Sequence, residues 1–104
     1  MKRHKYNAKR TTIDGFNFAS QAEAKRYEEL KLLWRAGEIT DLVLQPRFPI
    51  LVNGQKICTY IADFQYIDVQ GKTHVEDKKG YRTALYSIKK KLVRACLGIE
   101  IEEV

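Results

Sequence analysis

The sequence predicts one small domain of the α/β (α+β) class, in the element order helix, three strands, helix, strand. The chain has 104 residues, which fits a single domain and excludes a multi-domain enzyme. Hydrophobic residues make up 44% of the chain, so we expect a packed core and exclude a disordered polybasic chain. Two segments with helical periodicity enclose apolar stretches that are bounded by turn residues. We therefore expect a basic leader at residues 1–12 and the domain at residues 13–104.

The first elements follow directly after the leader. Asp14-Gly15 is a turn signal between short apolar pieces, which predicts a small hairpin or an ordered entry loop over residues 12–18. The clearest helix comes next: Ser20 is a good N-cap, and Glu23 stands three residues later, as in a capping box. Apolar residues then recur at helical spacing up to a glycine. The predicted helix is Ser20–Ala36.

The middle of the chain is rich in strand signals. We expect three strands, at residues 41–52, 57–69 and 73–79. Pro46 and Pro49 interrupt the first, and because proline donates no ladder hydrogen bond, that strand is an edge strand or is broken by a bend. Asn53-Gly54 is the strongest short hairpin signal in the chain, and Gln70-Gly71 predicts the next turn.

The last predicted elements are a basic amphipathic helix and a short strand. The helix begins near Thr83 with one apolar face and ends at Gly98. Alternation over residues 99–102 predicts the final strand.

Charge and composition narrow the classes of partner. The net charge of +6 favours a polyanion, most often a nucleic acid. No apolar run approaches the roughly 18 residues that cross a bilayer, so we expect no membrane segment. Cys58 and Cys96 show no metal-type spacing, and we expect two buried free thiols in a reducing, cytoplasmic compartment. His4 and His74 are isolated in the sequence and support no zinc site.

Acidic residues interrupt two apolar patterns. Glu23 completes the capping box, but it also precedes Tyr27 by four residues, on the side of the helix that carries the apolar stripe. Asp63 lies within a strand-like segment, where Asp is depleted and a buried carboxylate needs a cation beside it. A helix cap and a structural salt bridge explain the two acids without any function, so both explanations stay open.

The third acidic site is a run of alternating charge at residues 75–80. An acid and a lysine two positions apart project to one face of a strand, and two registers fit: Glu76 with Lys78, or Asp77 with Lys79. Taken alone, such a run is typical of a solvated strand. The expected hairpin, however, brings it toward Asp63, and converging carboxylates hold Mg²⁺ or Mn²⁺. A neighbouring lysine can orient an attacking water, which is the equipment for metal-assisted phosphodiester hydrolysis.

These residues resemble the signature of the PD-(D/E)XK nuclease superfamily, and most closely that of its small phage-encoded members. The resemblance implies a restriction-endonuclease-like core in the order αβββαβ, with a central mixed sheet flanked by helices. It covers about residues 16–104. The motifs that carry it are Ser20 to Glu23, Gln45-Pro46-Arg47-Phe48, Ala62-Asp63-Phe64 and Val75 to Gly80.

The resemblance implies roles for the acidic residues. Asp63 and Asp77 would be the central metal ligands, and Glu23 would be a further acid at the metal, as in junction-resolving and transposon-end-cutting relatives. Lys79 would be the catalytic lysine. The cofactor would be Mg²⁺ or Mn²⁺.

Two positions depart from the family pattern. Relatives usually place an apolar residue where Lys78 stands, which keeps the Glu76/Lys78 register open. The Lys79-Gly80 ending of the strand fits the family and favours the Asp77/Lys79 register. Ala62 stands where the family name expects proline.

Basic residues outside this cluster are candidates for DNA contacts. Thr83, Tyr86 and Lys89 fall at helical spacing and resemble the polar face that contacts the substrate backbone in relatives, although an ordinary amphipathic helix has the same spacing. The candidate DNA-binding residues are Lys2, Arg3, Lys5, Lys9, Arg10, Tyr86, Lys89 and Lys90.

The leading hypothesis is a DNA endonuclease that depends on Mg²⁺ or Mn²⁺. The resemblance suggests branched DNA, such as a Holliday junction, as the substrate. It also suggests a homodimer with two active sites, acting in the cytoplasm of a bacterial host if the chain is phage-encoded. One alternative is a non-catalytic DNA-binding or packaging accessory protein on the same fold. A basic RNA-binding protein is another, but it leaves Asp63 and Asp77 unexplained.

Overall fold

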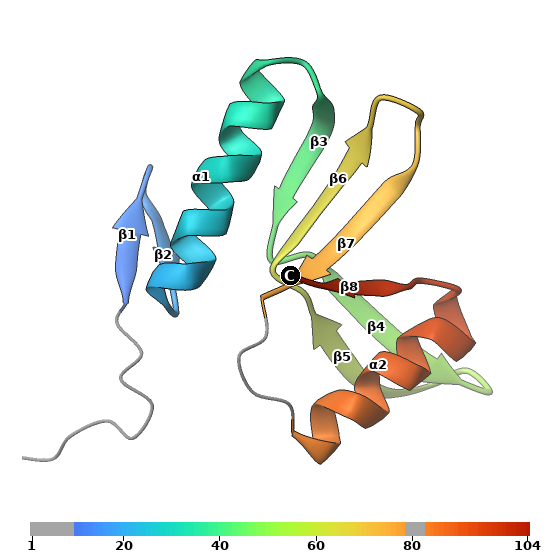
Figure 1. The fold of residues 1–104 in the computed structure, drawn as a ribbon. Helices are drawn as coiled ribbons and strands as arrows, with labels where there is room; N and C mark the ends of the chain where they lie inside the picture. The colour runs from blue at the N-terminus through green and yellow to red at the C-terminus, as the bar shows by residue number, and fades with distance from the viewer. Residues whose placement is uncertain (1–9, 79–82) are drawn as a thin grey trace, which may run out of the picture.

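A four-stranded mixed sheet lies at the centre of the molecule (Figure 1). The computed structural model describes residues 10–78 and 83–104. The strand order is β3-β6-β7-β8, in which β3, β6 and β7 are antiparallel neighbours and β8 runs parallel to β7. The bounds are β3 (Ile39–Leu44), β6 (Phe64–Asp68), β7 (Thr73–Asp77) and β8 (Ile101–Glu103). The predicted mixed α+β class is confirmed.

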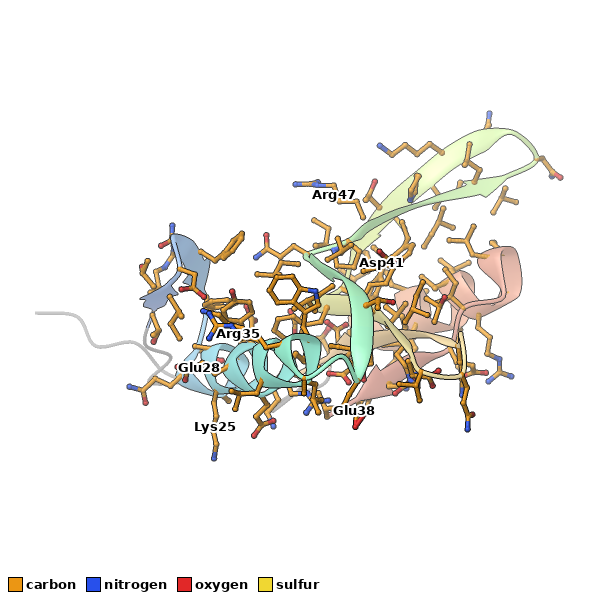
Figure 2. All side chains as sticks on the ribbon, turned by 90° about the horizontal axis from the view of Figure 1, so that it is seen from above. Lys25, Glu28, Arg35, Glu38, Asp41 and Arg47 are labelled. Atoms are coloured by element: carbon orange, nitrogen blue, oxygen red, sulfur yellow. The ribbon has the colours of Figure 1, made fainter. Side chains whose placement is uncertain are left out.

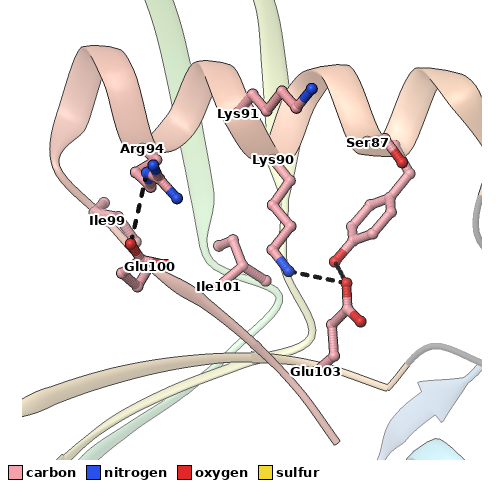
Figure 3. Close-up of a pocket in the computed structure, with 9 residues that line it drawn as sticks. Ser87, Lys90, Lys91, Arg94, Ile99, Glu100, Ile101 and Glu103 are labelled. Carbon is pink, nitrogen blue, oxygen red and sulfur yellow. Dashed lines mark hydrogen bonds and ion pairs between the residues drawn. The ribbon is translucent and has the colours of Figure 1, made fainter.

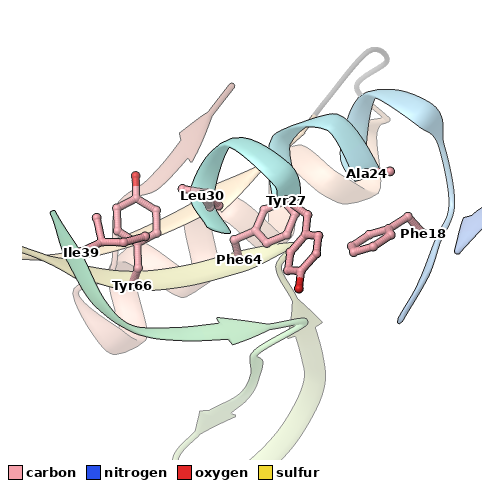
Figure 4. Packing of buried hydrophobic residues seen from close by; sticks show 7 residues of the cluster. All are labelled: Phe18, Ala24, Tyr27, Leu30, Ile39, Phe64 and Tyr66. Carbon is pink, nitrogen blue, oxygen red and sulfur yellow. The ribbon is translucent and has the colours of Figure 1, made fainter. Parts of the chain in front are cut away.

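Helix α1 (Gln21–Arg35) covers one face of this sheet. Its buried residues Tyr27 and Leu30 pack with Phe64 and Tyr66 of β6, as Figure 4 shows. Burying apolar area in this way stabilises the fold by roughly 25 cal/mol per Å². The exposed residues of α1 include Lys25 and Glu28, which are labelled in Figure 2, but also the apolar Leu32 and Trp34. The helix therefore meets the sheet along one stripe only.

The opposite face of the sheet packs against a second layer. This layer consists of helix α2 (Ala84–Leu97) and an antiparallel hairpin of β4 (Arg47–Val52) and β5 (Gln55–Ile61). The second core cluster joins Val93 of α2 and Ile50 of β4 to Val75 of β7. Both faces of β7 are consequently covered, and its last three residues are buried.

A short hairpin precedes α1. Its strands are β1 (Thr11–Ile13) and β2 (Phe16–Phe18), and they pair antiparallel. Asp14 and Gly15 both have positive φ, as a two-residue hairpin turn requires. The predicted Asp-Gly hairpin is confirmed, although its first strand begins inside the segment that was expected to be a leader.

The prediction of three strands between the helices is wrong for the described part of the chain, where five strands occupy that interval. Residues 41–52 divide into the end of β3 and β4, and residues 57–69 divide into β5 and β6. The two breaks face each other: Gln45 N–H donates to Asp63 O at 2.9 Å, and Ala62 N–H donates to Pro46 O at 3.1 Å. One long antiparallel ribbon is therefore bent in its middle, so that β3 and β6 enter the sheet while β4 and β5 leave it.

The cause of the bend is local. Gln45 has a φ of 52°, a left-handed conformation that interrupts the extended strand, and Pro46 follows it. The sequence prediction that residues 41–52 are broken by a bend is confirmed, but the matching break at Asp63 carried no signal of its own.

Both helices begin and end close to the predicted residues. The Ser20 side chain caps α1 by accepting from Glu23 N–H at 3.1 Å, and the Thr83 side chain caps α2 by accepting from Tyr86 N–H at 3.0 Å. Gly98 ends α2 with a φ of 69°. The final strand begins at Ile101 rather than at residue 99.

Two further predictions concern the membrane and the thiols. Within residues 10–78 and 83–104, neither helix is long and apolar enough to cross a membrane. Both cysteines are free, as predicted, but the expected burial is wrong: Cys58 is half-buried and Cys96 is exposed.

Candidate active site

The N-terminus of α1 carries the first acid of the site. Ser20 ends the extended entry to the helix, and its cap holds the first turn in place. Glu23 is only 9% exposed, and it hydrogen-bonds both the Ala19 backbone N–H and the Asp63 side chain. The Glu23 carboxylate thus faces the interior of the protein rather than solvent.

Asp63 occupies the bend in the β5–β6 ribbon. Its backbone N–H donates to Glu76 O at 3.1 Å and to Asp77 Oδ1 at 3.0 Å. Its own Oδ2 accepts from Lys78 N–H at 2.7 Å. The bend therefore turns the Asp63 carboxylate toward the end of β7 and fixes its orientation with backbone hydrogen bonds.

Asp77 is the last residue of β7 and is 1% exposed. Strand β8 holds it from the other side, because Asp77 pairs with Glu103 in parallel register and Val104 N–H donates to Asp77 O at 3.0 Å. The Asp77 side chain reaches the backbone N–H of Asp63 where β6 begins and β7 ends.

The central feature of the site is the electrostatic effect of Asp63 and Asp77 on Glu23. The pKa of Glu23 is raised from 4.5 to about 7 by burial, by the charge and hydrogen bond of Asp63, and by the charge of Asp77. The Ala19 N–H opposes this shift without overcoming it. Asp63 at the ribbon bend and Asp77 on β7 are thus close enough to Glu23 of α1 to disfavour its ionisation.

Glu76 lies on the other face of β7, against α1. Arg26 binds it with two hydrogen bonds, Nε to Oε1 at 2.8 Å and Nη2 to Oε2 at 2.7 Å, and the Tyr66 hydroxyl also donates to Oε2. Burial acts to raise the pKa of Glu76, but the hydrogen bonds from Arg26 and Tyr66 outweigh it and lower that pKa. Of the two acids in the competing registers, Asp77 meets Asp63 with its side chain, whereas Glu76 accepts from Asp63 only through its backbone oxygen.

Of the two candidate lysines, only Lys78 lies within the described residues. Lys78 is exposed, and its backbone N–H binds Asp63. Lys79, with Gly80, falls in the interval between residues 78 and 83 that the structure leaves undescribed. The choice between the two lysines accordingly stays a prediction.

The donor chemistry of the site suits a hard divalent cation. Carboxylate oxygens are the ligands that Mg²⁺ and Mn²⁺ prefer, and a cation would relieve the mutual repulsion that raises the pKa of Glu23. Within residues 10–78 and 83–104, no three His, Cys, Asp or Glu side chains already stand in a metal-ligating arrangement.

Two of the predicted DNA-binding residues of α2, Tyr86 and Lys90, line a cavity of about 260 Å³ between α2 and β8 (Figure 3). Tyr86 is 8% exposed and its hydroxyl donates to Glu103 at 2.9 Å, so its predicted place on an exposed polar face is wrong. Its ring packs at 6.3 Å from that of Tyr60 in the core. Lys90 is half-buried and pairs with the same Glu103 at 3.0 Å.

The other predicted DNA-binding residues lie away from this cavity or outside the described residues. Lys89 is half-buried on α2, and Arg10 is exposed. Lys2, Arg3, Lys5 and Lys9 lie outside the described residues.

Sequence reasoning missed several residues of this region. Arg26 carried one signal, because it stands three residues after Glu23 and so shares its side of the helix. Glu103 lay beyond the predicted final strand. His74, which appeared isolated in the sequence, is held between Asp68 at 2.8 Å and Glu102 at 2.7 Å. Asp68 lies six residues away, across the β6–β7 turn, whereas Glu102 lies 28 residues away, and no local pattern indicates that partner.

Comparison with known proteins assigns the chain to a family but gives that family no activity. The chain belongs to the family described as "Protein of unknown function (DUF1064)", whose model matches residues 3–98. Searches of curated proteins and of solved structures found no match.

Proposed function

We propose that this member of the DUF1064 family is a DNA endonuclease that hydrolyses phosphodiester bonds with the help of Mg²⁺ or Mn²⁺. The observation that carries the proposal is the convergence of Glu23, Asp63 and Asp77, which the structure builds from three separate elements. A structural protein gains no stability from buried acids that repel one another. A metal-dependent hydrolase needs such a cluster.

Each acid has a distinct task in this proposal. Asp63 and Asp77 are oriented by backbone hydrogen bonds and would hold the cation, with Glu23 completing the set. The bound cation would supply an activated water and would stabilise charge at the phosphate. The pKa of Glu23 is raised to about 7 in the metal-free protein, and a bound cation would lower it, so Glu23 would bind the metal as a carboxylate. Lys79 would orient the water and offset phosphoryl charge, as the resemblance to PD-(D/E)XK nucleases implies.

The architecture supports a restriction-endonuclease-like core. In this interpretation, the central acids lie where two inner strands of the mixed sheet meet, with Asp63 directly before β6 and Asp77 at the end of β7, and α1 brings a further acid from the side. The bent ribbon makes the strand count larger than the expected pattern, because two long strands each contribute to the sheet and to the hairpin.

DNA is the proposed substrate because the chain is strongly basic outside the acidic site. The net charge is +6, and α2 presents Lys91 and Arg94 to solvent. Such residues grip phosphates without reading sequence. Branched DNA and a homodimer with two active sites belong to the proposal through the resemblance.

A cleavage assay tests the function. Purified protein is incubated with labelled junction, flap, duplex and single-stranded DNA, in Mg²⁺, Mn²⁺ or EDTA. We expect cleavage in either metal, none in EDTA, and a loss of more than about 100-fold for Asp63→Asn and for Asp77→Asn. Glu28→Gln, an exposed acid on the same helix as Glu23, is the matched control for Glu23→Gln.

The outcomes separate the alternatives. If no DNA is cut in any metal but all four DNAs are bound, the protein is a non-catalytic DNA-binding accessory. If Asp77→Asn still cuts and Glu76→Gln does not, the acid of the second register is the catalytic one. Preferential cutting of the junction supports a branched substrate, and equal cutting of duplex DNA removes that part of the proposal.

A further inference from the structure

Arg26 and Glu76 form an ion pair that joins α1 to β7 beneath the candidate site. The guanidinium approaches the carboxylate with two parallel N–H donors, at 2.8 and 2.7 Å, and Glu76 is 1% exposed. The Tyr66 hydroxyl donates to the same carboxylate from β6. A planar, bidentate pair of this kind fixes both distance and direction, which a lysine could not do equally well.

Each end of the pair is adjacent to an acid of the site. Arg26 follows Glu23 by three residues, so the two side chains project from the same side of α1. Glu76 directly precedes Asp77 on β7. The ion pair thus connects the helix that carries Glu23 to the strand that carries Asp77.

Repulsion among the acids of the site opposes the close packing of α1 against β7. Ionised Glu23, Asp63 and Asp77 repel one another, and the first turn of α1 can relieve that repulsion by moving away from the sheet. The apolar contacts of α1 lie mainly with β2, β3 and β6, through residues such as Phe18, Ile39 and Phe64. The Arg26–Glu76 pair supplies hydrogen bonds from α1 to β7, where the repulsion acts.

We infer that Arg26 is a positioning residue, whose bidentate pair with Glu76 holds α1 against β7 and thereby keeps Glu23 facing Asp63 and Asp77 for metal binding. This inference rests on the proposed metal-dependent function. It assigns to Glu76 a role as anchor rather than metal ligand, and it explains why two consecutive acids occur on one strand: each serves a different face.

Two measurements test it, and one of them needs no metal. The variants are Arg26→Gln, Arg26→Lys and Glu76→Gln. Glu29→Gln is the control, because it removes only the exposed partner of Arg26, which lies at 3.0 Å. Amide hydrogen exchange of the metal-free protein reports opening of the first turn of α1. Binding of Mn²⁺, followed by loss of the free-ion paramagnetic resonance signal, reports the assembled site.

We expect Arg26→Gln to speed exchange in the first turn of α1 about tenfold or more, with exchange in α2 unchanged. We expect the same variant to weaken Mn²⁺ binding by about 10–100-fold. Arg26→Lys should recover part of both losses, Glu76→Gln should resemble Arg26→Gln, and Glu29→Gln should match the unaltered protein.

The failures are distinguishable. If Arg26→Gln leaves exchange in the first turn unchanged, or raises it equally in α2, Arg26 does not position the helix and the inference is overturned. Unchanged Mn²⁺ affinity in Arg26→Gln overturns it as well, while the proposed function stands. If the unaltered protein binds no Mn²⁺, the proposed function fails, and the exchange data alone decide whether Arg26 holds α1 in place.

Discussion

Glu76 and Asp77 are neighbours on β7 and equally buried, yet they belong to opposite electrostatic settings. Glu76 faces α1, where Arg26 and Tyr66 bind both of its oxygens and its pKa is lowered. Asp77 faces the bend of the ribbon, where Asp63 and Glu23 bring further carboxylates toward it. Because side chains alternate across a strand, a shift of one residue moves a carboxylate from one setting to the other.

The contrast separates two uses of buried charge. On the α1 face, cations and hydroxyls compensate the carboxylate, so the charge helps to hold the elements together. At the bend, like charges meet, and Glu23 keeps its proton to about pH 7. An arrangement that costs stability while its neighbour is well compensated is typical of a functional site. The following predictions test this contrast, from the largest expected effect on stability to the smallest.

Removing the positive charge of Arg26, which compensates buried Glu76, should have the largest effect on stability. Arg26→Leu leaves the Glu76 charge buried, which should lower the free energy of unfolding by about 3–5 kcal/mol. Replacing both partners, Arg26→Leu with Glu76→Leu, should recover most of that loss. Urea unfolding checks both values. Equal losses in the single and double variants would show that the pair contributes by packing rather than by charge.

Removing a charge from the acidic site should have the opposite sign. The pKa of Glu23 is about 7 in the folded protein, above its ordinary 4.5, so the folded state keeps the proton longer and stability falls as pH rises between those values. Glu23→Gln should therefore raise the free energy of unfolding by about 1–3 kcal/mol at alkaline pH, and by almost nothing near pH 4. Urea unfolding at the two pH values measures this. A stabilisation that does not depend on pH would contradict the origin in charge.

Removing either helix cap should lower the stability by a smaller amount. Ser20→Ala and Thr83→Ala each remove a side-chain oxygen that accepts from the first turn, at 3.1 and 3.0 Å, and each should cost about 1 kcal/mol of stability. Ser20→Ala should also weaken metal binding, because the cap holds the backbone of Glu23. Thermal unfolding and Mn²⁺ titration of both variants test this; equal metal binding in the two would separate the cap from the site.

The smallest effect concerns His74, which ties the β6–β7 hairpin to β8 on the α1 face. Its hydrogen bond to Asp68, followed by that to Glu102, raises the pKa of His74 above its ordinary 6.5 despite burial. Its contribution is therefore complete below that value and is lost as pH rises through the raised pKa. The midpoint temperature of thermal unfolding should decrease as the pH is raised from about 6 to about 9, and the decrease should be smaller in His74→Gln. A fall of equal size in both proteins would assign the effect to other groups.

Much of the local structure could be predicted from the sequence because its causes are local. Ser20 and Thr83 cap helices through their own first turns, and Asp14-Gly15 forms its hairpin with nearest neighbours. The division of each long strand could not be predicted. It depends on the pairing of Gln45 with Asp63, which are eighteen positions apart, and Asp63 shows no local turn signal.

The candidate site divides in the same way. Glu23, Asp63 and Asp77 could be picked out as acids in places where local patterns disfavour them, and their spacing allowed them to meet. Sequence spacing left both Glu76 and Asp77 open, because either acid has a lysine two positions on, and only the Lys79-Gly80 ending favoured Asp77. It also placed Tyr86 on a polar face, whereas contact with Tyr60 and Glu103 draws it into the core.

The amino-acid sequence alone settles the helices, the tight turns and the identity of the acids, because these depend on backbone preferences and on residue chemistry. Tertiary structure decides which acid faces which neighbour. The bend at Gln45 and Asp63 turns one carboxylate toward β7, and Arg26 then selects Glu76 for the opposite face. That decision belongs to long-range packing, since the environment of a buried charge is set by whatever distant segment the fold lays beside it.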